Sequence, residues 1–302
     1  MKRFVSVGEC MIEMSGGEDG QYRLGFAGDT LNTAWYARAK LPDDWSVDYV
    51  TALGDDLYSQ QMVNFFAENN IGIGHIQKIE GKRPGLYLIH QADGDRHFTY
   101  WRNQSAARLI ADDPEALIAA FARADIAYFS GISLAILAPR ARGKLMEAIH
   151  LAREGGARVA FDPNERPLLW TSPRVMGSTI TAAATIADIV LPTFPDEAAI
   201  FGDVSPEAVA ERYLSWGAEE VVVKNGAEPA YVASREASGW VAPQPGAVSL
   251  DPTGAGDSFN GAYLAARATG ASPLEAAAAA HGTARIVIGH RGALVPHAVF
   301  DR

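Results

Sequence analysis

The chain has 302 residues, of which 48% are hydrophobic and 21% charged, and this composition excludes a disordered chain. Its formal net charge of −10 comes without any cluster of lysine and arginine, which argues against a nucleic-acid partner. No apolar run is long enough to cross a bilayer and the single cysteine, Cys10, suits a reducing compartment, so we expect an unanchored, cytoplasmic protein that folds as one domain over residues 1–302.

Short runs of β-branched and aromatic residues recur along the chain and predict buried strands. They occupy residues 4–7, 47–53, 126–130, 158–162, 188–192 and 220–224. Between most of these runs lie Ala-rich segments of helical periodicity, at 28–40, 56–69, 139–154 and 205–216. This alternation predicts a mostly parallel sheet that is covered by helices on both faces.

One region departs from the alternation. Residues 85–103, GLYLIHQADGDRHFTYWRN, contain two runs of period two joined by ADGD, which is a hairpin signal. A hairpin inserted into an α/β chain is expected outside the main sheet, as a flap or lid, with His97 packed inside it. We expect the lid segments at about 10–26 and 83–104.

Near the C-terminus, residues 251–259 read DPTGAGDSF and precede an i, i+3, i+4, i+7 pattern that begins at Phe259. A helix N-terminus offers unpaired N–H groups and a partial positive charge, and glycines let an anion reach them, so we expect a phosphate or a transferring phosphoryl group there. The carboxylate of Asp257 would repel a phosphate unless it has another task, and the natural task is that of a general base on an attacking hydroxyl. The alternative is that Asp257 only complements the helix dipole.

The segment DPTGAGDSFNGA, residues 251–262, resembles the C-terminal signature of the ribokinase-like, or PfkB, carbohydrate kinases. Further segments resemble the other motifs of this family in the same order along the chain: GFAGDTLNTAWYARA at 25–39 with VTALGDD at 50–56, DPNER at 162–166, and VVVKNGAEPAYV at 221–232. The resemblance implies a three-layer α/β fold, with a mostly parallel central sheet flanked by helices and a small β-sheet lid over the sugar. It also implies that the protein uses ATP and Mg2+.

The resemblance further implies roles for residues on the nucleotide side. Asp257 is the implied general base, while Gly254, Ala255 and Gly256 supply the anion hole. The other residues implied to contact ATP are Asn164, Arg166, Lys224, Asn225, Gly226, Ala227, Glu228, Pro229 and Ala230. Proline at position 229 is a departure, because a glycine is commoner there.

The motif that organises the water shell of the metal, Asn-x-x-Glu in the family, appears here as TFPDE. Thr193 replaces the Asn, and Asp196 stands at the Glu position with Glu197 beside it. Either acid offers a hard oxygen that suits hydrated Mg2+. Asp251 matches a position associated with a monovalent cation, so K+ is a further implied cofactor.

The acceptor is predicted from polar groups on the lid. Tyr100 and Arg102 are two residues apart and therefore share one face of their predicted strand. A neutral sugar needs no guanidinium, whereas arginine can grip the carboxylate of a sugar acid for about 1.5–3 kcal/mol. The alternative is that Arg102 is a solvated surface charge. The residues implied to bind the sugar are Gly28, Asp29, Asn32, Tyr87, Tyr100, Arg102, Arg166 and Asp257, with His290 as a further candidate beside Arg291.

Together, Tyr87, the YWR run at 100–102 and Arg166 resemble the 2-keto-3-deoxygluconate kinase branch of the family. This implies transfer of the γ-phosphoryl group of ATP to the 6-hydroxyl of 2-dehydro-3-deoxy-D-gluconate, giving 2-dehydro-3-deoxy-6-phosphogluconate for Entner–Doudoroff-type catabolism. The alternatives are a kinase of a neutral ketose such as fructose, and a non-catalytic sugar- or nucleotide-binding regulator on the same fold. Because an exposed lid edge needs cover, we also expect a homo-oligomer, a dimer or higher.

Overall fold

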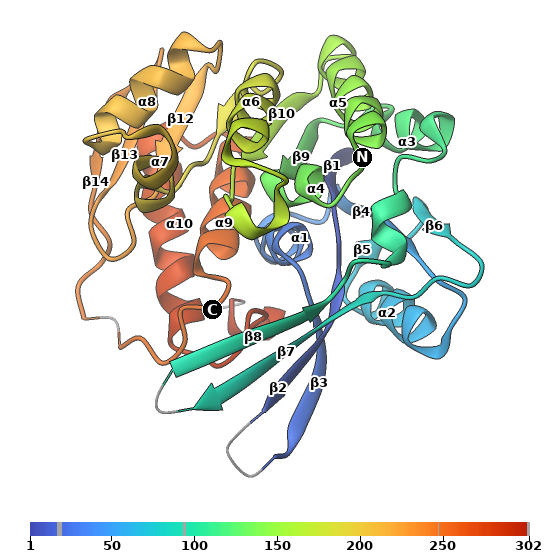
Figure 1. Cartoon of the computed structure of the whole chain (residues 1–302). Helices are drawn as coiled ribbons and strands as arrows, with labels where there is room; N and C mark the ends of the chain where they lie inside the picture. Colours follow the sequence, from blue (N-terminus) through green and yellow to red (C-terminus); the bar gives the residue numbers. More distant parts are fainter. Residues whose placement is uncertain (17–19, 93–94, 247, 301–302) are drawn as a thin grey trace.

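The main sheet follows the predicted alternation of strand and helix (Figure 1). The computed structural model describes residues 1–16, 20–92, 95–246 and 248–300. Over these residues, ten strands form the main sheet, in the order β14-β13-β12-β11-β10-β9-β1-β4-β5, with β6 also paired to β4. They are β1 (Lys2–Val7), β4 (Trp45–Leu53), β5 (Ile71–Gly72), β6 (Ile76–Lys78), β9 (Ile126–Ser130), β10 (Arg158–Asp162), β11 (Ile189–Val190), β12 (Glu220–Val223), β13 (Ala230–Ser234) and β14 (Ser238–Val241). All pairings from β12 to β5 are parallel, and only β13 and β14 at one edge are antiparallel.

Helices cover both faces of this sheet. One face carries α1 (Asp29–Lys40), α2 (Leu57–Glu68), α9 (Ala255–Ala268) and α10 (Pro273–Ile288). The other carries α3 (Pro114–Phe121), α4 (Gly131–Ala135), α5 (Pro139–Glu154), α6 (Pro173–Ala184), α7 (Phe194–Phe201) and α8 (Pro206–Ser215). Short 3-10 helices also occur in the connecting segments, namely η1 (Ala106–Leu109), η2 (Pro167–Leu169) and η3 (His297–Val299). The predicted three-layer α/β class is therefore confirmed.

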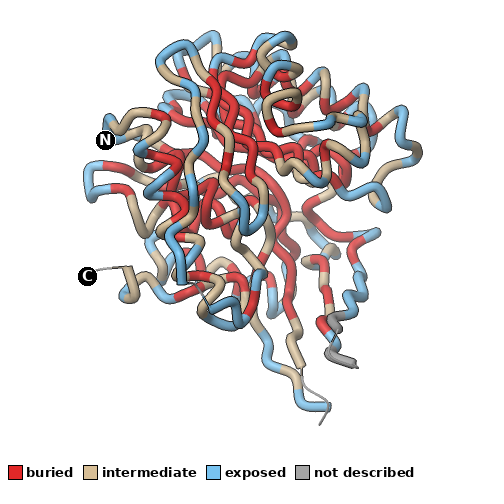
Figure 2. The backbone as a smooth tube through the Cα atoms, turned by 90° about the vertical axis from the view of Figure 1, so that its left-hand side faces the viewer, coloured by how far each residue is buried: buried red, intermediate tan, exposed pale blue. Residues whose placement is uncertain are grey.

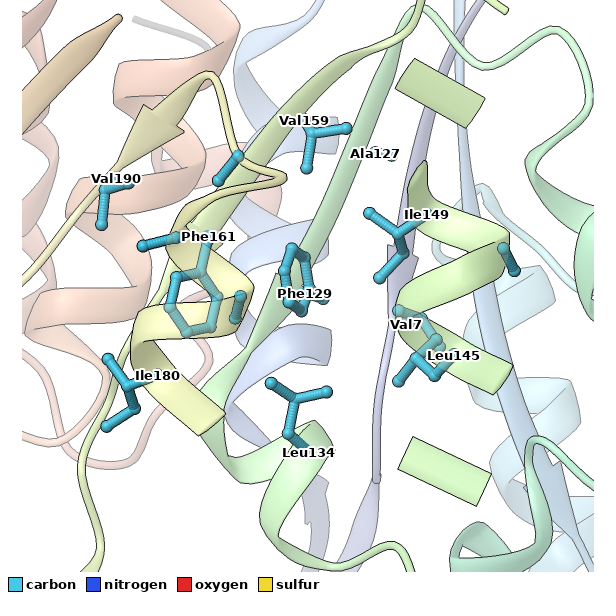
Figure 3. Packing of buried hydrophobic residues seen from close by; sticks show 14 of the residues in the cluster. Val7, Ala127, Phe129, Leu134, Leu145, Ile149, Val159, Phe161, Ile180 and Val190 are labelled. Atoms are coloured by element: carbon cyan, nitrogen blue, oxygen red, sulfur yellow. The ribbon is translucent and has the colours of Figure 1, made fainter. Parts of the chain in front are cut away.

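The protein has two large hydrophobic cores, one on each face of the main sheet. They form because successive side chains along a strand point to opposite faces. In β9, Phe129 points into the core with α5 and α6, whereas Tyr128 points into the core with α1 and α9. Figure 3 shows the first of these cores, where the rings of Phe129 and Phe161 stack with centroids 4.7 Å apart and Ile180 of α6 lies on the same side. Since both faces are buried, the strands read as continuous apolar runs, which is why the sequence predicted them.

A second, small sheet of four strands projects from the main body in the described part of the chain (Figure 1). Its order is β3 (Tyr22–Ala27), β2 (Met11–Gly16), β7 (Gly85–Ala92) and β8 (Asp95–Trp101). The antiparallel pairing of β7 with β8 confirms the predicted hairpin, although residues 93–94 of its ADGD turn lie outside the described residues. Figure 2 shows the buried strands in the middle of the molecule and the more exposed end of the small sheet below them.

Parallel strands bring their C-terminal ends to one edge of the sheet, and α/β proteins bind ligands at this edge. β1 leads there into Glu9, β9 ends at Ser130, β10 ends at Asp162, and β12 leads into Lys224. The small sheet and the N-termini of α1 and α9 begin from the same edge. No helix in the described ranges is both long and apolar enough to span a membrane.

Candidate active site

Glycines shape the N-terminus of α9, where the sequence predicts an anion site. Gly254 is the N-cap with φ of 76°, a left-handed conformation that favours glycine. A Cβ at this position would lie 2.7 Å from the carbonyl oxygen of Ala293, so a side chain is also excluded sterically. The first N–H groups of a helix have no intrahelical partner and can bind an anion. Here the N–H of Ala255 donates to the carbonyl oxygen of Pro252 at 3.1 Å, whereas those of Gly254 and Gly256 make no hydrogen bond with the described residues.

Asp257 lies in the first turn of the same helix and is half-buried. Its Oδ2 accepts a hydrogen bond of 2.8 Å from Nδ2 of Asn32 on α1. Burial, with the charges of Asp29 and Asp162, raises the pKa of Asp257 to about 7 against the opposing effects of Asn32 and Lys224. A carboxyl group that titrates near neutral pH can both take and release a proton, as a general base must.

A buried polar network connects α9 to the main sheet. The Nζ of Lys224 donates to Oδ2 of Asp162 and to Oδ1 of Asn260, both at 3.1 Å. Asn260 in turn donates from Nδ2 to Asp162 at 2.7 Å and to the hydroxyl of Tyr128 at 3.2 Å. A Cβ on Gly256 would lie 3.8 Å from the same Nζ, which places the ammonium directly beneath the anion site. Sequence reasoning missed Asp162 and Asn260, although Asp162 ends a predicted strand.

The DPNER segment continues this network toward α1. Asn164 has a left-handed φ of 36°, and its Nδ2 donates to Oδ2 of Asp29 at 3.0 Å. Burial raises the pKa of Asp29. Arg166 is exposed, and its Nη1 donates to the carbonyl oxygen of Glu165 at 2.7 Å. Asn164 and Asp29 therefore belong to the polar network around Asp257, while Arg166 lies at its rim.

The two acids of TFPDE have different surroundings. Glu197 is fully buried and accepts hydrogen bonds from Arg212 at 2.6 Å and from the hydroxyl of Tyr213 at 2.7 Å, so its oxygens are turned into the core of the protein. Asp196 is half-buried, and burial raises its pKa while Arg166 opposes this shift. Of the two acids, Asp196 is therefore the one whose carboxyl group is partly accessible to a hydrated cation.

The same region fits Mg2+ held mainly by phosphate oxygens. The described residues contain no group of three or more His, Cys, Asp or Glu side chains that could hold a metal ion alone. Mg2+ commonly keeps several waters and uses one or two carboxylates together with substrate phosphates, so a single half-buried acid such as Asp196 suits it. Asp251 is buried and accepts from the N–H groups of Thr253 at 2.9 Å and of Gly292 at 2.8 Å. It therefore anchors the loop before α9.

The predicted nucleotide loop is the turn between β12 and β13. Residues 225–229 are partly or fully exposed there, with Gly226 at a left-handed φ of 61°, whereas Ala230 is fully buried in β13. A groove of about 680 Å3, which sequence reasoning missed, lies between α10 and the segment before α9. Its lining includes Gln244, Val248, Thr283, Ile286 and His290. His290 thus lies on the α10 side of the site.

The predicted lid residues share one face of the small sheet. The Tyr87 ring stacks on the half-exposed ring of Tyr100, with centroids 5.7 Å apart, and the Arg102 guanidinium lies 6.0 Å from the Tyr100 centroid. The hydroxyl of Tyr87 donates to Glu13, and Arg102 is buried in an ion pair with Glu9. Neither glutamate was predicted.

Ala293 connects the small sheet to the anion site. It belongs to one buried cluster with Tyr87 of β7, and it is also the residue against which Gly254 packs. Gly28, which precedes α1, packs against the backbone of Glu9, because a Cβ there would be 2.1 Å from the carbonyl oxygen of Glu9. The structure therefore brings the predicted sugar residues beside the predicted phosphoryl site, although they come from opposite ends of the chain.

Comparison with known proteins matches the chain to a known family. The family described as "pfkB family carbohydrate kinase" matches residues 1–298. The 2-dehydro-3-deoxygluconokinase of Escherichia coli (strain K12) is 42% identical over 304 residues, which cover 98% of this chain and 97% of the relative. Among solved structures, a PfkB protein from Polaromonas sp. JS666 is 27% identical with a TM-score of 0.86, covering 100% of this chain and 99% of the other.

A second solved structure shares the fold at lower identity. It is a putative ribokinase II from E. coli in complex with ATP and Mg2+, with a TM-score of 0.82 and 22% identity. The match covers 97% of this chain and 94% of that protein.

Proposed function

Because the chain belongs to the pfkB family of carbohydrate kinases, we propose that it transfers the γ-phosphoryl group of ATP to the 6-hydroxyl of 2-dehydro-3-deoxygluconate. The observation that carries the reaction type is Asp257, a carboxyl group of near-neutral pKa in the first turn of a helix whose glycine N-terminus is open to an anion. A sugar acid as acceptor is supported by Arg102 on the lid face and by the name of the relative that is 42% identical.

In the proposed mechanism, Asp257 takes the proton of the 6-hydroxyl while the hydroxyl oxygen attacks the γ-phosphorus. The bond from phosphorus to the bridging oxygen breaks, and ADP leaves with the electron pair. The N–H groups of Gly254 and Gly256 stabilise the charge on the transferring phosphoryl group, and that of Ala255 joins them if it releases the carbonyl oxygen of Pro252. The ammonium of Lys224, close to Gly256, adds to this field. Mg2+, when bound, neutralises charge on the phosphates, and Asp196 would hold its water shell.

The groove beside α10 is the proposed site of the adenosine. Its volume of about 680 Å3 lies in the range of small-molecule pockets. We assign the exposed turn at 225–229 to the nucleotide, and we assign His290 to this groove rather than to the sugar. Asn164 would face the phosphates. Asp251 remains our candidate for a monovalent cation such as K+, acting through the loop that it anchors.

A neutral ketose such as fructose is the second candidate acceptor, and one observation favours it. The guanidinium of Arg102 already has a carboxylate partner in Glu9, so its charge is partly compensated before any substrate binds. A coupled assay of ADP release over a panel of sugar acids and neutral ketoses separates the candidates. We expect the highest kcat/KM with 2-dehydro-3-deoxygluconate, and a higher value with fructose would reject the sugar-acid proposal.

We further propose that residues 1–302 form one kinase domain in which the small sheet is the lid. Leu24 and Trp101 are 41% and 58% exposed, and the strand register places them on the face of the small sheet opposite to Tyr87. Exposed apolar side chains on a two-edged sheet favour a homo-oligomer through this face. A cytoplasmic location stays a prediction from the unpaired thiol of Cys10.

A further inference from the structure

The buried pair of Glu9 and Arg102 has no task in the proposed transfer step. Glu9 lies between β1 and β2, two residues after β1 ends, and Arg102 directly follows β8, so the pair joins the main sheet to the small sheet. The side chain of Glu9 is 1% exposed and that of Arg102 is 8% exposed. Burying two charges costs several kcal/mol per ion before their attraction is counted, so stability alone is a weak reason for this pair.

The pair leaves one edge of the guanidinium open. Nε of Arg102 donates to Oε2 of Glu9 at 2.8 Å, and Nη2 lies against the same oxygen. Nη2 is buried and makes no aligned hydrogen bond with the described residues, and the Nε bond is the only hydrogen bond that this guanidinium makes with them. A guanidinium has a second edge, formed by Nη1 and Nη2, that can hold a carboxylate by two N–H groups. The edge through Nη1 therefore remains for a ligand.

Two glycines fix the position of Glu9 in this arrangement. A Cβ on Gly85 would come 2.8 Å from Oε1 of Glu9 and 3.2 Å from Cβ of Arg102, so the pair lies directly against the backbone of β7. Gly28 packs equally closely on the backbone of Glu9. Burial raises the pKa of Asp29, and the charge of Arg102 acts in the opposite direction.

We propose that Glu9 is a positioning residue for the sugar-acid carboxylate. By holding the Nε edge of Arg102, it turns the Nη1 edge toward the acceptor and fixes the guanidinium before the substrate arrives. This inference rests on the proposed function, because it requires an acceptor that carries a carboxylate. Preorganisation of this kind lowers the entropic cost of binding without adding a contact to the substrate.

The pair predicts that Glu9→Gln changes the affinity for the acid in opposite directions, depending on whether Arg102 is present. Oε1 of Glu9 is buried and has no hydrogen-bond partner among the described residues, so the negative charge of Glu9 depends on Arg102 for compensation. If Arg102 is replaced by leucine, that charge stands uncompensated beside the acid subsite and repels the substrate. Glu9→Gln should therefore weaken binding of the acid in the wild-type background and improve it in the Arg102→Leu background.

The experiment measures KM and kcat of the full chain for 2-dehydro-3-deoxygluconate with wild type, Glu9→Gln, Arg102→Leu and the double variant. We expect Glu9→Gln alone to raise KM for the acid about tenfold, with kcat and KM for ATP within about twofold, from the loss of one charge-assisted hydrogen bond. In the Arg102→Leu background, the same change should lower KM for the acid by about threefold or more. Glu154→Gln removes a carboxylate from an exposed pair on α5 and serves as the control.

The outcomes separate the two proposals. If wild type does not phosphorylate the acid, the proposed function fails, whereas normal turnover with no effect of Glu9→Gln overturns only the role of Glu9. Effects of the same sign in both backgrounds also overturn it, because a purely structural role predicts them. If Glu9→Gln does not fold by thermal melting, Glu9→Asp replaces it. This variant keeps the charge but shortens the reach, so it should raise KM for the acid without relieving the defect of Arg102→Leu.

Discussion

The pH dependence of kcat/KM reports directly on Asp257, because this parameter follows the ionisation of the free enzyme. Burial and the neighbouring charges of Asp29 and Asp162 raise the pKa of Asp257 to about 7. A base acts only when deprotonated, so activity should rise as the pH passes upward through 7. The deprotonated fraction increases about tenfold from pH 6 to pH 8, whereas a carboxyl group at its ordinary pKa would stay ionised across this range.

Replacing Asn32 by leucine tests whether the ionisation of Asp257 causes this rise of kcat/KM on the acid side of the pH profile, its acid limb. The Nδ2 of Asn32 donates to Oδ2 of Asp257 at 2.8 Å and opposes the rise in its pKa. Loss of a hydrogen bond to a charged group is worth about 1.5–3 kcal/mol, of which 1.36 kcal/mol corresponds to one pKa unit. The acid limb should therefore move up by about one pH unit or more.

The assay is initial-rate ADP release from pH 5.5 to 9 with Mg2+ in excess. Asn64→Leu on α2 is the matched control, because it removes an exposed amide that accepts a hydrogen bond from Gln60. Any ionisation of the nucleotide affects the pH profiles of both variants equally. Its acid limb should stay near pH 7. A limb that is unmoved in Asn32→Leu, or that lies below pH 5.5 in the wild type, would refute the assignment of Asp257 as the titrating base.

Three further perturbations test other parts of the site. Gly254→Ala should lower kcat at least tenfold and reduce Tm, because the left-handed backbone alone costs about 1–2 kcal/mol and its Cβ would lie 2.7 Å from the Ala293 carbonyl; unchanged kinetics would contradict the anion-site geometry. Asp196→Asn should raise the Mg2+ concentration for half-maximal rate about tenfold with little change in Tm, and an unchanged Mg2+ titration would remove Asp196 from the metal site. Lys224→Met should cost about 3–5 kcal/mol in a denaturant titration by leaving the buried charge of Asp162 without its cationic partner, and Asp162→Asn in the same chain should restore part of this loss. A stability equal to wild type would show that the pair is not needed.

Local patterns in the sequence predicted the sheet and the start of α9. The strands of the main sheet are buried on both faces, so their apolar runs are continuous, and the face of α9 that begins at Phe259 is buried as its spacing predicts. The helices at 114–121, 173–184 and 194–201 were not predicted, nor were edge strands β13 and β14. Most of these elements are short, and their apolar pattern does not distinguish a helix from a strand. The helix at 173–184 has 12 residues, as α1 does, and length does not explain why it was missed.

Pairings across the chain could not be predicted. The lid pattern indicated that Tyr87 and Arg102 were available to the substrate, yet each has a glutamate partner. Glu9 is 93 residues from Arg102, and an acid at the end of one strand has the same local pattern as a surface acid. The network of Asp162, Lys224 and Asn260 likewise joins three elements whose contact exists only in the folded sheet.

The most direct test of the account compares wild type with Asp257→Asn, using MgATP and 2-dehydro-3-deoxygluconate. We predict that wild type converts the acid to its 6-phosphate with stoichiometric ADP, and that Asp257→Asn loses at least about 10²-fold in kcat while its affinity for MgATP, measured by calorimetry, changes little. An Asn variant that forms the 6-phosphate at the wild-type rate would contradict the central claim.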